Sequence, residues 1–268
     1  MENSVRTAAI TGAGSGIGKQ IAVQLATRGW NLHLADFDCD SLLETRQCCA
    51  KQGFDLTTTV LNVSDRDQMY AWASSTLPKA DSIFNVAGVL HGGDVVDTPI
   101  KDFERVMDIN FWGVIHGTKA FLPQILDSPR GQIVNVSSAF GVMSAPGYSA
   151  YNSSKFAVRG FTEALSQELL TTSKTARATC VIPGGVATSI ARTARVAPGV
   201  DKQQLADLFD RYIARTDPRD AARKIIAGAE KGKPRVLIGP DARLVDLTVR
   251  AFGSNYQRIF PLLQRLRR

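Results

Sequence analysis

Short apolar runs alternate with longer helical patterns along almost the whole chain, and no other feature restricts the possible folds as strongly. We expect strands at residues 5–11, 31–36, 54–63, 81–88, 131–138, 176–184 and 234–239. We expect helices at residues 17–29, 41–52, 65–77, 99–126, 148–172 and 217–231. Strands joined by helical crossovers of this length pair in parallel and carry helices on both faces of the sheet. The alternation therefore predicts an α/β fold, a doubly wound parallel sheet of about seven strands in a three-layer αβα sandwich.

Two segments depart from this alternation. Residues 185–216 follow a strand but contain only short helical pieces, with Pro198 and Gly199 between them. An irregular insert after the carboxyl end of a strand is where a substrate lid would lie. The second segment is the helical C-terminal extension, residues 240–268. No repeat, low-complexity tract or Pro/Gly-rich linker divides the chain, so we expect one domain over residues 1–268.

The extension carries apolar residues at helical spacing with arginines between them. These apolar residues are Leu244, Leu247, Ala251, Ile259, Leu263 and Leu266. We favour packing of this segment on the sheet edge or on a neighbouring subunit. Closure over the substrate pocket and peripheral contact with an anionic membrane stay open as alternatives. Pro261 disfavours the membrane alternative because it interrupts a long amphipathic helix.

The charge and the cysteine content limit which partners, metal sites and cellular location we expect. The formal net charge is +7. Residues 241–268 hold six Arg against Asp241 and Asp246, so +4 of that charge lies in the extension. No nucleic-acid-binding motif accompanies it, so we expect no nucleic-acid partner. The four cysteines have no metal-ligand spacing, which predicts reduced thiols, no metal site and, with no leader pattern at the N-terminus, a cytoplasmic protein.

A glycine-rich loop follows the first expected strand and opens the first expected helix. Its sequence, TGAGSGIG, spans Thr11 to Gly18. Glycines at this junction allow a tight turn and a close approach of backbone to a pyrophosphate, which then lies at the positive end of the helix. The loop thus predicts dinucleotide binding on a Rossmann-type sheet.

The second expected strand ends in Asp36, 18 residues after Gly18. A carboxylate there can accept hydrogen bonds from both hydroxyls of the adenosine ribose, and it would repel a 2′-phosphate. The next residue is Phe37 rather than an Arg or Lys that could bind that phosphate. Lys19 lies outside the loop, and we expect it to be a solvated helix residue. We therefore predict NAD as the cofactor, with NADP disfavoured.

Taken together, the motifs from about residue 5 to residue 239 resemble those of the short-chain dehydrogenase/reductase family. They occur in family order and at family spacing: TGxxxGxG at Thr11–Gly18, an NNAG-like motif at Asn85–Gly88, Asn110, Ser138, YxxxK at Tyr151 and Lys155, and Pro183-Gly184 followed by Thr188. Val86 replaces the second Asn of NNAG. The resemblance implies a nicotinamide-dependent oxidoreductase acting on alcohols or ketones.

The Tyr151–Lys155 pair suits proton transfer, because a spacing of four puts both side chains on one helical face. A free tyrosine is a poor base at neutral pH, and a nearby ammonium is expected to lower its pKa. Ser137 and Ser138 end one strand and point to opposite faces, and nothing local chooses between them. The resemblance selects Ser138 as the hydroxyl that holds the substrate oxygen, and it implies that Asn110 holds a water in a proton relay ending at Lys155.

The resemblance also implies the remaining site. Cofactor contacts are expected at Gly12, Ser15, Gly16, Ile17, Gly18, Asp36, Phe37, Asn62, Val63, Asn85, Ala87, Gly88, Tyr151, Lys155, Pro183, Gly184, Val186 and Thr188. Asn62 stands where many members have an acid, and its side-chain oxygen can accept from the adenine amino group. The substrate pocket is expected to be lined by Ser138, Ala139, Phe140, Met143, Tyr148 and Gly185. We expect His91 to be a surface loop residue outside the catalytic set.

These expectations converge on an NAD(H)-dependent oxidoreductase that interconverts an apolar, secondary alcohol and its ketone or aldehyde. An NADPH-dependent carbonyl or 3-oxoacyl reductase of the same family stays open, as does a non-catalytic NAD(H)-binding sensor or scaffold. The family resemblance also suggests a homotetramer or homodimer built on the helices that carry Asn110 and Tyr151.

Overall fold

Seven parallel strands form one sheet in the order β3-β2-β1-β4-β6-β7-β9. The computed structural model describes residues 5–49 and 54–258. The strands are β1 (Thr7–Thr11), β2 (Asn31–Asp36), β3 (Leu56–Val60), β4 (Ser82–Asn85), β6 (Gln132–Val136), β7 (Arg177–Pro183) and β9 (Arg235–Ile238). All seven expected strands are present, and β2 has the expected bounds. The others are shorter, because the apolar runs extend into the loops at the strand ends.

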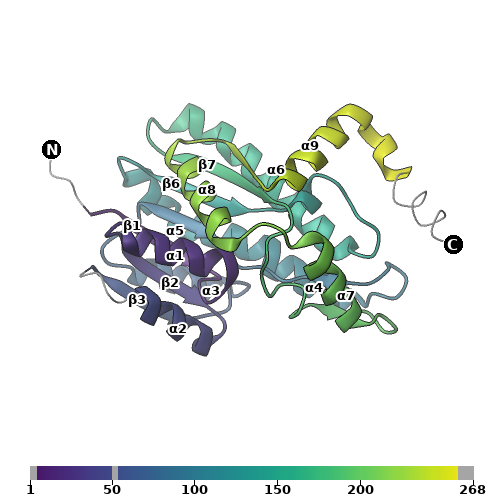
Figure 1. Cartoon of the computed structure of the whole chain (residues 1–268). Coiled ribbons are helices and arrows are strands. Elements are labelled where there is room, and N and C mark those ends of the chain that lie inside the picture. Colours follow the sequence, from purple (N-terminus) through teal and green to yellow (C-terminus); the bar gives the residue numbers. More distant parts are fainter. Residues whose placement is uncertain (1–4, 50–53, 259–268) are drawn as a thin grey trace.

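Helices cover both faces of this sheet (Figure 1). One face carries α1 (Gly16–Thr27), α2 (Cys39–Cys49) and α8 (Pro218–Glu230). The other carries α3 (Arg66–Ser75), α5 (Gly113–Asp127) and α6 (Ser149–Thr172). Strand alternation divides the core between them: Ile10 packs on the first face and Ala9 on the second. The predicted three-layer, doubly wound α/β fold is confirmed.

The segment expected as one helix at residues 99–126 has a π-helical turn in its middle. It consists of α4 (Ile100–Met107), the π-turn η1 (Asp108–Trp112) and α5. The Gly113 amide donates to the Asp108 carbonyl across the π-turn. Such turns insert one extra residue into a helix and often occur at functional sites. Here the turn contains Asn110.

Residues 185–216 contain little regular structure: β8 (Arg195–Val196), α7 (Lys202–Leu208) and a second π-turn, η3 (Phe209–Ile213). The short strand β5 (His91–Gly92) pairs in parallel with β8 and ties this segment to the loop after β4. This second sheet was not expected from the sequence, because two residues are too few to show strand periodicity. A 3₁₀ turn, η2 (Ala139–Gly141), follows β6.

The C-terminal extension begins with α9 (Pro240–Phe252) and a 3₁₀ segment, η4 (Gly253–Arg258). Val245 and Val249 pack beside the edge strand β9, against a small cluster that includes Cys180. Leu244 and Leu247, which we expected on the packing face, are 65% and 64% exposed. That expectation was wrong.

The orientation of α9 explains the error, because it directs Ala242, Val245 and Val249, at spacings of three and four, toward the sheet. Sequence periodicity alone cannot choose between two adjacent apolar stripes on one helix. The expected positions Ile259, Leu263 and Leu266 lie outside the described residues.

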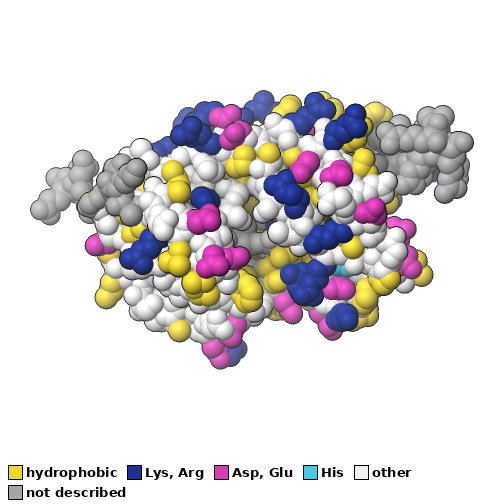
Figure 2. Space-filling view, turned by 60° about the horizontal axis from the view of Figure 1, so that its bottom comes forward, with side chains coloured by type: hydrophobic (Ala, Val, Ile, Leu, Met, Phe, Trp, Pro, Cys, Tyr) yellow, Lys and Arg dark blue, Asp and Glu magenta, His cyan; other side chains and the backbone are white. Residues whose placement is uncertain are grey.

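The surface charge is dispersed on the face drawn in Figure 2, where Lys and Arg side chains alternate with acidic and apolar ones. Within residues 5–49 and 54–258, no helix has the length and apolar character needed to cross a membrane. In the same part of the chain, no three His, Cys, Asp or Glu side chains gather as metal ligands would.

Candidate active site

The glycine loop is held against the loop that follows β4. The Thr11 hydroxyl accepts hydrogen bonds from the amides of Val86 and Ala87, at 3.1 and 3.3 Å. Gly12 has a φ of +66° and Gly16 a φ of +50°, a region that favours glycine. A Cβ at Gly12 would lie 2.7 Å from the Ala87 amide nitrogen. Glycine is therefore needed here for both its conformation and its size.

A cavity of about 370 Å³ lies beside this loop. Gly14, Ser15 and Gly16 form one side, at the N-terminus of α1. Thr188 lies opposite, within 2.9 Å of where a Cβ at Gly16 would be. The first turn of α1 holds no acidic side chain. Free amides at the positive end of a helix, facing such a cavity, fit a pyrophosphate group.

Asp36 contacts Gly14, one of the residues that line this cavity. One carboxylate oxygen accepts from the Gly14 amide at 2.8 Å, and the other accepts from the Asp38 amide at 3.1 Å. These bonds fix the carboxylate beside the glycine loop and leave lone pairs free for ribose hydroxyls. Phe37 is 76% exposed. The geometry thus places the Asp36 carboxylate beside the glycine loop.

Two expected cofactor contacts use their side chains elsewhere. The side-chain amide of Asn85 donates to the side-chain oxygen of Asn135 at 2.8 Å and to the Thr118 hydroxyl at 3.2 Å, inside the protein. Asn85 can therefore reach a cofactor only through its backbone. The Asn62 side-chain oxygen accepts from both the amide and the hydroxyl of Ser64, at 3.1 and 2.8 Å. An adenine amino group would have to displace one of these bonds.

Tyr151 and Lys155 lie near the start of α6, and both are buried. The Lys155 ammonium is 5.6 Å from the centre of the Tyr151 ring and donates to the Val136 carbonyl at 3.0 Å. The Ser138 hydroxyl accepts from the Phe140 amide at 3.1 Å and lies close enough to the Tyr151 phenol to favour a lower pKa of that phenol. Ser137 points the other way and donates to the Lys155 carbonyl at 2.7 Å. Of the two serines, Ser138 is thus the one that faces the tyrosine.

Burial is the main influence on the pKa values of Tyr151 and Lys155. It raises the pKa of Tyr151 to about 12, against the opposing effect of the Ser138 hydroxyl. It also lowers the pKa of Lys155 to about 8. Both shifts follow from the cost of a charge in a poorly solvated site. The expectation that a nearby ammonium lowers the pKa of Tyr151 is not met by the chain alone, because burial is the dominant cause of the shift.

Asn110 is fully buried in the π-turn. Its oxygen accepts from the Val89 amide at 2.7 Å, and its nitrogen donates to the Val89 carbonyl at 2.9 Å and to Ser154 at 3.0 Å. A Cβ at Gly88 would lie 3.2 Å from both the Asn110 oxygen and the Lys155 ammonium. Asn110 therefore fixes the loop after β4 and lies close to Lys155.

An apolar cluster surrounds the exposed side of Tyr151. Phe140 contributes a ring 6.3 Å from that of Tyr151, and Tyr148 a ring 5.5 Å from that of Phe140. The other members are Leu90, Ile190, Ala191, Ala194, Val196, Val200, Leu205 and Phe209. Gly185 is buried against the backbone of Ile213. Met143 and Ala139, which we expected here, are not among the clustered side chains of the described residues.

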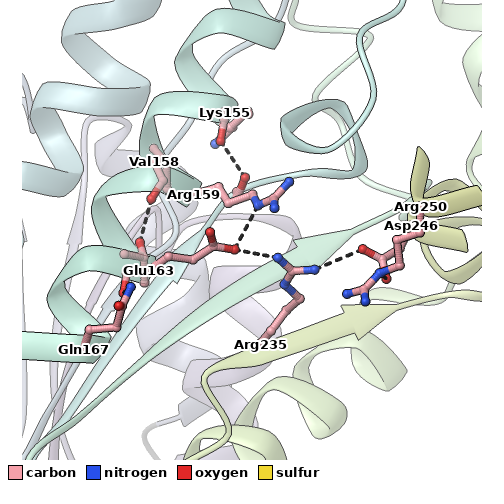
Figure 3. A network of polar contacts seen from close by, with 10 residues as sticks. Lys155, Val158, Arg159, Glu163, Gln167, Arg235, Asp246 and Arg250 are labelled. Carbon is pink, nitrogen blue, oxygen red and sulfur yellow. Dashed lines mark hydrogen bonds and ion pairs between the residues drawn. The ribbon is translucent and has the colours of Figure 1, made fainter. Parts of the chain in front are cut away.

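Farther along its length, helix α6 is anchored by a network of ion pairs (Figure 3). Glu163 pairs with Arg159 at 2.9 Å and with Arg235 of β9. Arg235 also pairs with Asp246 of α9 at 3.0 Å, and Asp246 with Arg250 at 2.9 Å. The network joins the helix that carries Tyr151 to the sheet edge and to the C-terminal extension.

Comparison with known proteins assigns the chain to a family. Residues 6–198 match the family model described as short chain dehydrogenase. The chain belongs to the short-chain dehydrogenase/reductase family. Homologues across this family are named as oxidoreductases, dehydrogenases and reductases, so the chain is an NAD(P)-dependent oxidoreductase.

Three relatives and structures illustrate the similarity. "Putative oxidoreductase SadH" of Mycobacterium tuberculosis is 44% identical over 257 residues, covering 95% of this chain and 93% of that protein. The 3-ketodihydrosphingosine reductase of Bos taurus is 31% identical over 250 residues, covering 88% and 72%. A short-chain dehydrogenase/reductase from Burkholderia phymatum, solved in complex with NAD, has a TM-score of 0.85 at 28% identity, covering 96% of each chain.

Several residues of this dehydrogenase site were not expected from the sequence. Lys19 and Arg192 both line the cavity at the glycine loop, where we expected Lys19 to be solvated. Lys19 pairs with Glu44 at 3.4 Å, and Arg192 with Asp210 at 2.6 Å. The position of Lys19, one residue after Gly18, was a usable signal. No local sequence signal pointed to Arg192, because its position depends on how residues 185–216 fold back.

His91 was wrongly expected at the surface. It is only 2% exposed, and burial lowers its pKa. Its Nε2 lies 3.8 Å from Asp102, and Arg195 lies 3.8 Å from the same carboxylate. The short pairing of β5 with β8 buries the ring. His91 therefore belongs to the connection between the enzyme body and residues 185–216.

Proposed function

We propose that this protein is an NAD(H)-dependent oxidoreductase that interconverts an apolar, secondary alcohol and its ketone. The observation that carries the proposal is the meeting of Ser138, Tyr151 and Lys155 beside an apolar cluster, with the glycine loop and Asp36 along the same edge of the sheet. A bound nicotinamide would supply the hydride acceptor or donor. The chain itself supplies the proton, the orientation and the exclusion of water.

Tyr151 acts as the proton donor to a ketone oxygen in our proposal. With a pKa raised to about 12, the phenol is protonated at neutral pH, as reduction requires. The Ser138 hydroxyl, which lies beside the phenol, would hydrogen-bond the substrate oxygen. Lys155 holds a positive charge near the ring, and Asn110 fixes the loop beside Lys155. In the oxidation direction the same phenol must first lose its proton.

We propose NAD over NADP because of the carboxylate of Asp36. Its two hydrogen bonds to backbone amides hold it beside the glycine loop, where a 2′-phosphate would meet a fixed negative charge. Lys19 lines the cavity beside this loop, but its pairing with Glu44 offsets its charge. An NADPH-dependent reductase is the alternative that this geometry disfavours.

We propose an apolar substrate on the basis of the cluster around Tyr151. Its side chains are aliphatic or aromatic, and several come from residues 185–216, which we propose to act as the substrate lid. The relatives named 3-ketodihydrosphingosine reductase and estradiol 17-beta-dehydrogenase 11 carry names of apolar substrates; the mouse form of the second is 31% identical over 204 residues. Both names support an apolar ketone or alcohol here.

We further propose a single domain that assembles as a homodimer or homotetramer through η1, α5 and α6. Exposed apolar side chains lie on these helices: Trp112, Leu126, Phe156 and Leu170 are each at least 37% exposed. Burial of such side chains in a neighbouring subunit is favourable. The four free cysteines, two of them exposed, accord with a cytoplasmic location.

Turnover of a ketone panel tests the proposed function. Cyclic, aliphatic and steroid-like ketones are offered with NADH or NADPH, and cofactor consumption is followed by absorbance. The proposal expects turnover of at least one apolar ketone, faster with NADH, and its loss in Tyr151→Phe with NADH binding retained. Undiminished turnover by Tyr151→Phe would remove the tyrosine from the chemistry. NADH binding without turnover of any ketone or alcohol would favour the sensor or scaffold alternative.

A further inference from the structure

A carboxylate outside the proposed catalytic set lies where the two ends of residues 185–216 meet. Asp241 is the second residue of α9, and one of its oxygens accepts a hydrogen bond from the Gly185 amide at 2.5 Å. Its other oxygen, Oδ1, is buried and has no hydrogen-bond partner among the described residues. A buried carboxylate oxygen without a hydrogen bond costs free energy, so the position of Asp241 needs a compensating interaction.

Two glycines beside Asp241 leave space for its side chain. A methyl group added at Gly184 would overlap the carboxylate, and one added at Gly239 would overlap its Oδ1 atom. Gly239 has a φ of +92°, which favours glycine for a second reason. The Gly184 amide donates to the Ile238 carbonyl at 2.9 Å, which ties the end of β7 to the end of β9. The carboxylate therefore occupies a close-fitting space between two strand ends.

The same point joins the beginning and the end of the proposed lid. The Gly185 carbonyl accepts from the amides of Arg215 and Thr216, at 3.1 and 3.0 Å. The Thr216 carbonyl accepts from the Ala187 amide at 2.9 Å. Gly185 is thus bonded through its carbonyl to the end of the lid and through its amide to Asp241. Removing the Asp241 acceptor would leave the Gly185 amide without its partner.

We propose that Asp241 is a positioning residue that clamps the two ends of the lid and so sets the place of the loop carrying Val186 and Thr188. The carboxylate lies in the first turn of α9, where the helix dipole favours a negative charge. The extension would thereby control lid geometry without touching the substrate. This inference rests on the proposed role of residues 185–216 as the lid, but its main test requires no turnover.

Hydrogen exchange of the whole protein, followed by mass spectrometry, tests the clamp. Asp241→Ala should accelerate exchange in peptides covering residues 184–188 and 213–217 by at least about tenfold, because a hydrogen bond to a charged acceptor is lost. Exchange in β1 and β4 should stay unchanged, which shows that the fold is intact. If Asp241→Ala does not fold, Asp241→Ser is used instead, since its shorter side chain suits a helix start but cannot reach the Gly185 amide.

Asp246→Ala is the matched control, because Asp246 lies on the same helix and pairs with Arg235 and Arg250 rather than with the lid. It should accelerate exchange within α9 and leave the lid ends unchanged. Asp241→Asn keeps an acceptor oxygen and should restore most of the protection. Unchanged lid-end exchange in Asp241→Ala, or equal acceleration in Asp246→Ala, would overturn the clamp.

Kinetics supply a second readout that general destabilisation would not reproduce. Asp241→Ala should raise the KM for the ketone and the Kd for NADH by roughly tenfold each, while kcat at saturation changes by less than about threefold. A loss confined to kcat would contradict a positioning role. If the wild-type protein turns over no ketone, the proposed function fails, and hydrogen exchange still decides on the clamp.

Discussion

The two halves of the proposed site are built in different ways. On the cofactor side, the glycine loop, Asp36 and the loop after β4 are held by hydrogen bonds from backbone amides to the side chains of Asp36 and Thr11, at the ends of neighbouring strands of the sheet. On the substrate side, the walls come from residues 185–216, whose regular structure is limited to short pieces. The first half is held at the strand ends of the sheet, whereas the second is held by contacts at its two ends and by the short pairing of β8 with β5. Changes in the first half should therefore affect cofactor binding sharply, whereas single changes in the second should have graded effects on substrate.

The largest expected effect is at Tyr151, where the two halves meet. Tyr151→Phe should lower kcat by about 10²–10⁴-fold, the usual contribution of a general acid, while the Kd for NADH stays within a factor of about two. Steady-state kinetics and NADH fluorescence titration measure the two quantities. Tyr148→Phe is the control, because it removes a hydroxyl from the same apolar cluster and should leave kcat nearly unchanged.

Next comes Gly12→Ala, which tests the rigidity of the cofactor half. The new Cβ would meet the Ala87 amide while the backbone keeps a φ of +66°, so the Kd for NADH should rise roughly 10- to 100-fold. Gly29→Ala is matched to it, with a φ of +74° but nothing within 4 Å of the added methyl. That variant should lose stability without losing NADH affinity. Equal loss of affinity in both would point to general destabilisation.

The rates of alcohol oxidation and of ketone reduction should depend on pH in different ways. Burial raises the pKa of Tyr151 to about 12, so the phenolate fraction, and with it the rate of alcohol oxidation, should rise about tenfold per pH unit near neutrality. Ketone reduction uses the neutral phenol and should be flat up to about pH 8. Above that pH, Lys155 loses its proton, since burial lowers its pKa to about 8, and reduction should decline. A reduction rate that rises with pH would contradict this assignment.

Asp36→Ala should have a smaller effect. The Kd for NADH should rise by about tenfold, because two ribose hydrogen bonds to a charged acceptor are lost, and the Kd for NADPH should fall relative to it. Titrations with both cofactors give the ratio. Asp40→Ala, which removes an exposed carboxylate nearby, should leave the ratio unchanged. An unaltered ratio in Asp36→Ala would remove this residue from cofactor selection.

The smallest effect should come from the lid. Leu205 is buried in the cluster around Tyr151, and Leu205→Ala should raise the KM for an apolar ketone by only about threefold to fivefold, with NADH affinity unchanged. Leu208→Ala on the same helix removes a side chain that is 51% exposed and serves as the control. A KM that does not respond to Leu205→Ala would exclude this cluster as the substrate pocket.

Sequence reasoning succeeded where local chemistry determines the structure. The seven strands follow from the periodicity of the apolar residues. The glycine loop follows from glycines at positions where the backbone has a positive φ, and Asp36 ends its strand as expected. The π-turn at Asn110 could not be predicted, because helical periodicity continues on both sides of a one-residue insertion. The roles of the site residues stay predictions until the variants above are measured.

Prediction from the sequence failed where contacts between distant segments determine the structure. His91 is buried because β5 pairs with β8 more than 100 residues later, and no local pattern signals that pairing. The exposed stripe at Leu244 and Leu247 depends on how α9 is rotated by its contacts with the sheet edge. The pKa of Tyr151 depends on burial, which the spacing to Lys155 does not reveal. All three depend on contacts between segments that are distant in the sequence.

Isotope transfer tests the central claim most directly. The wild-type protein is incubated with a ketone from the panel and NADH carrying deuterium at the transferring C4 position, and the product is analysed by mass spectrometry. The account predicts an alcohol with one deuterium on its carbinol carbon, and no such product with Tyr151→Phe. An alcohol without deuterium, or unchanged label transfer by Tyr151→Phe, would contradict it.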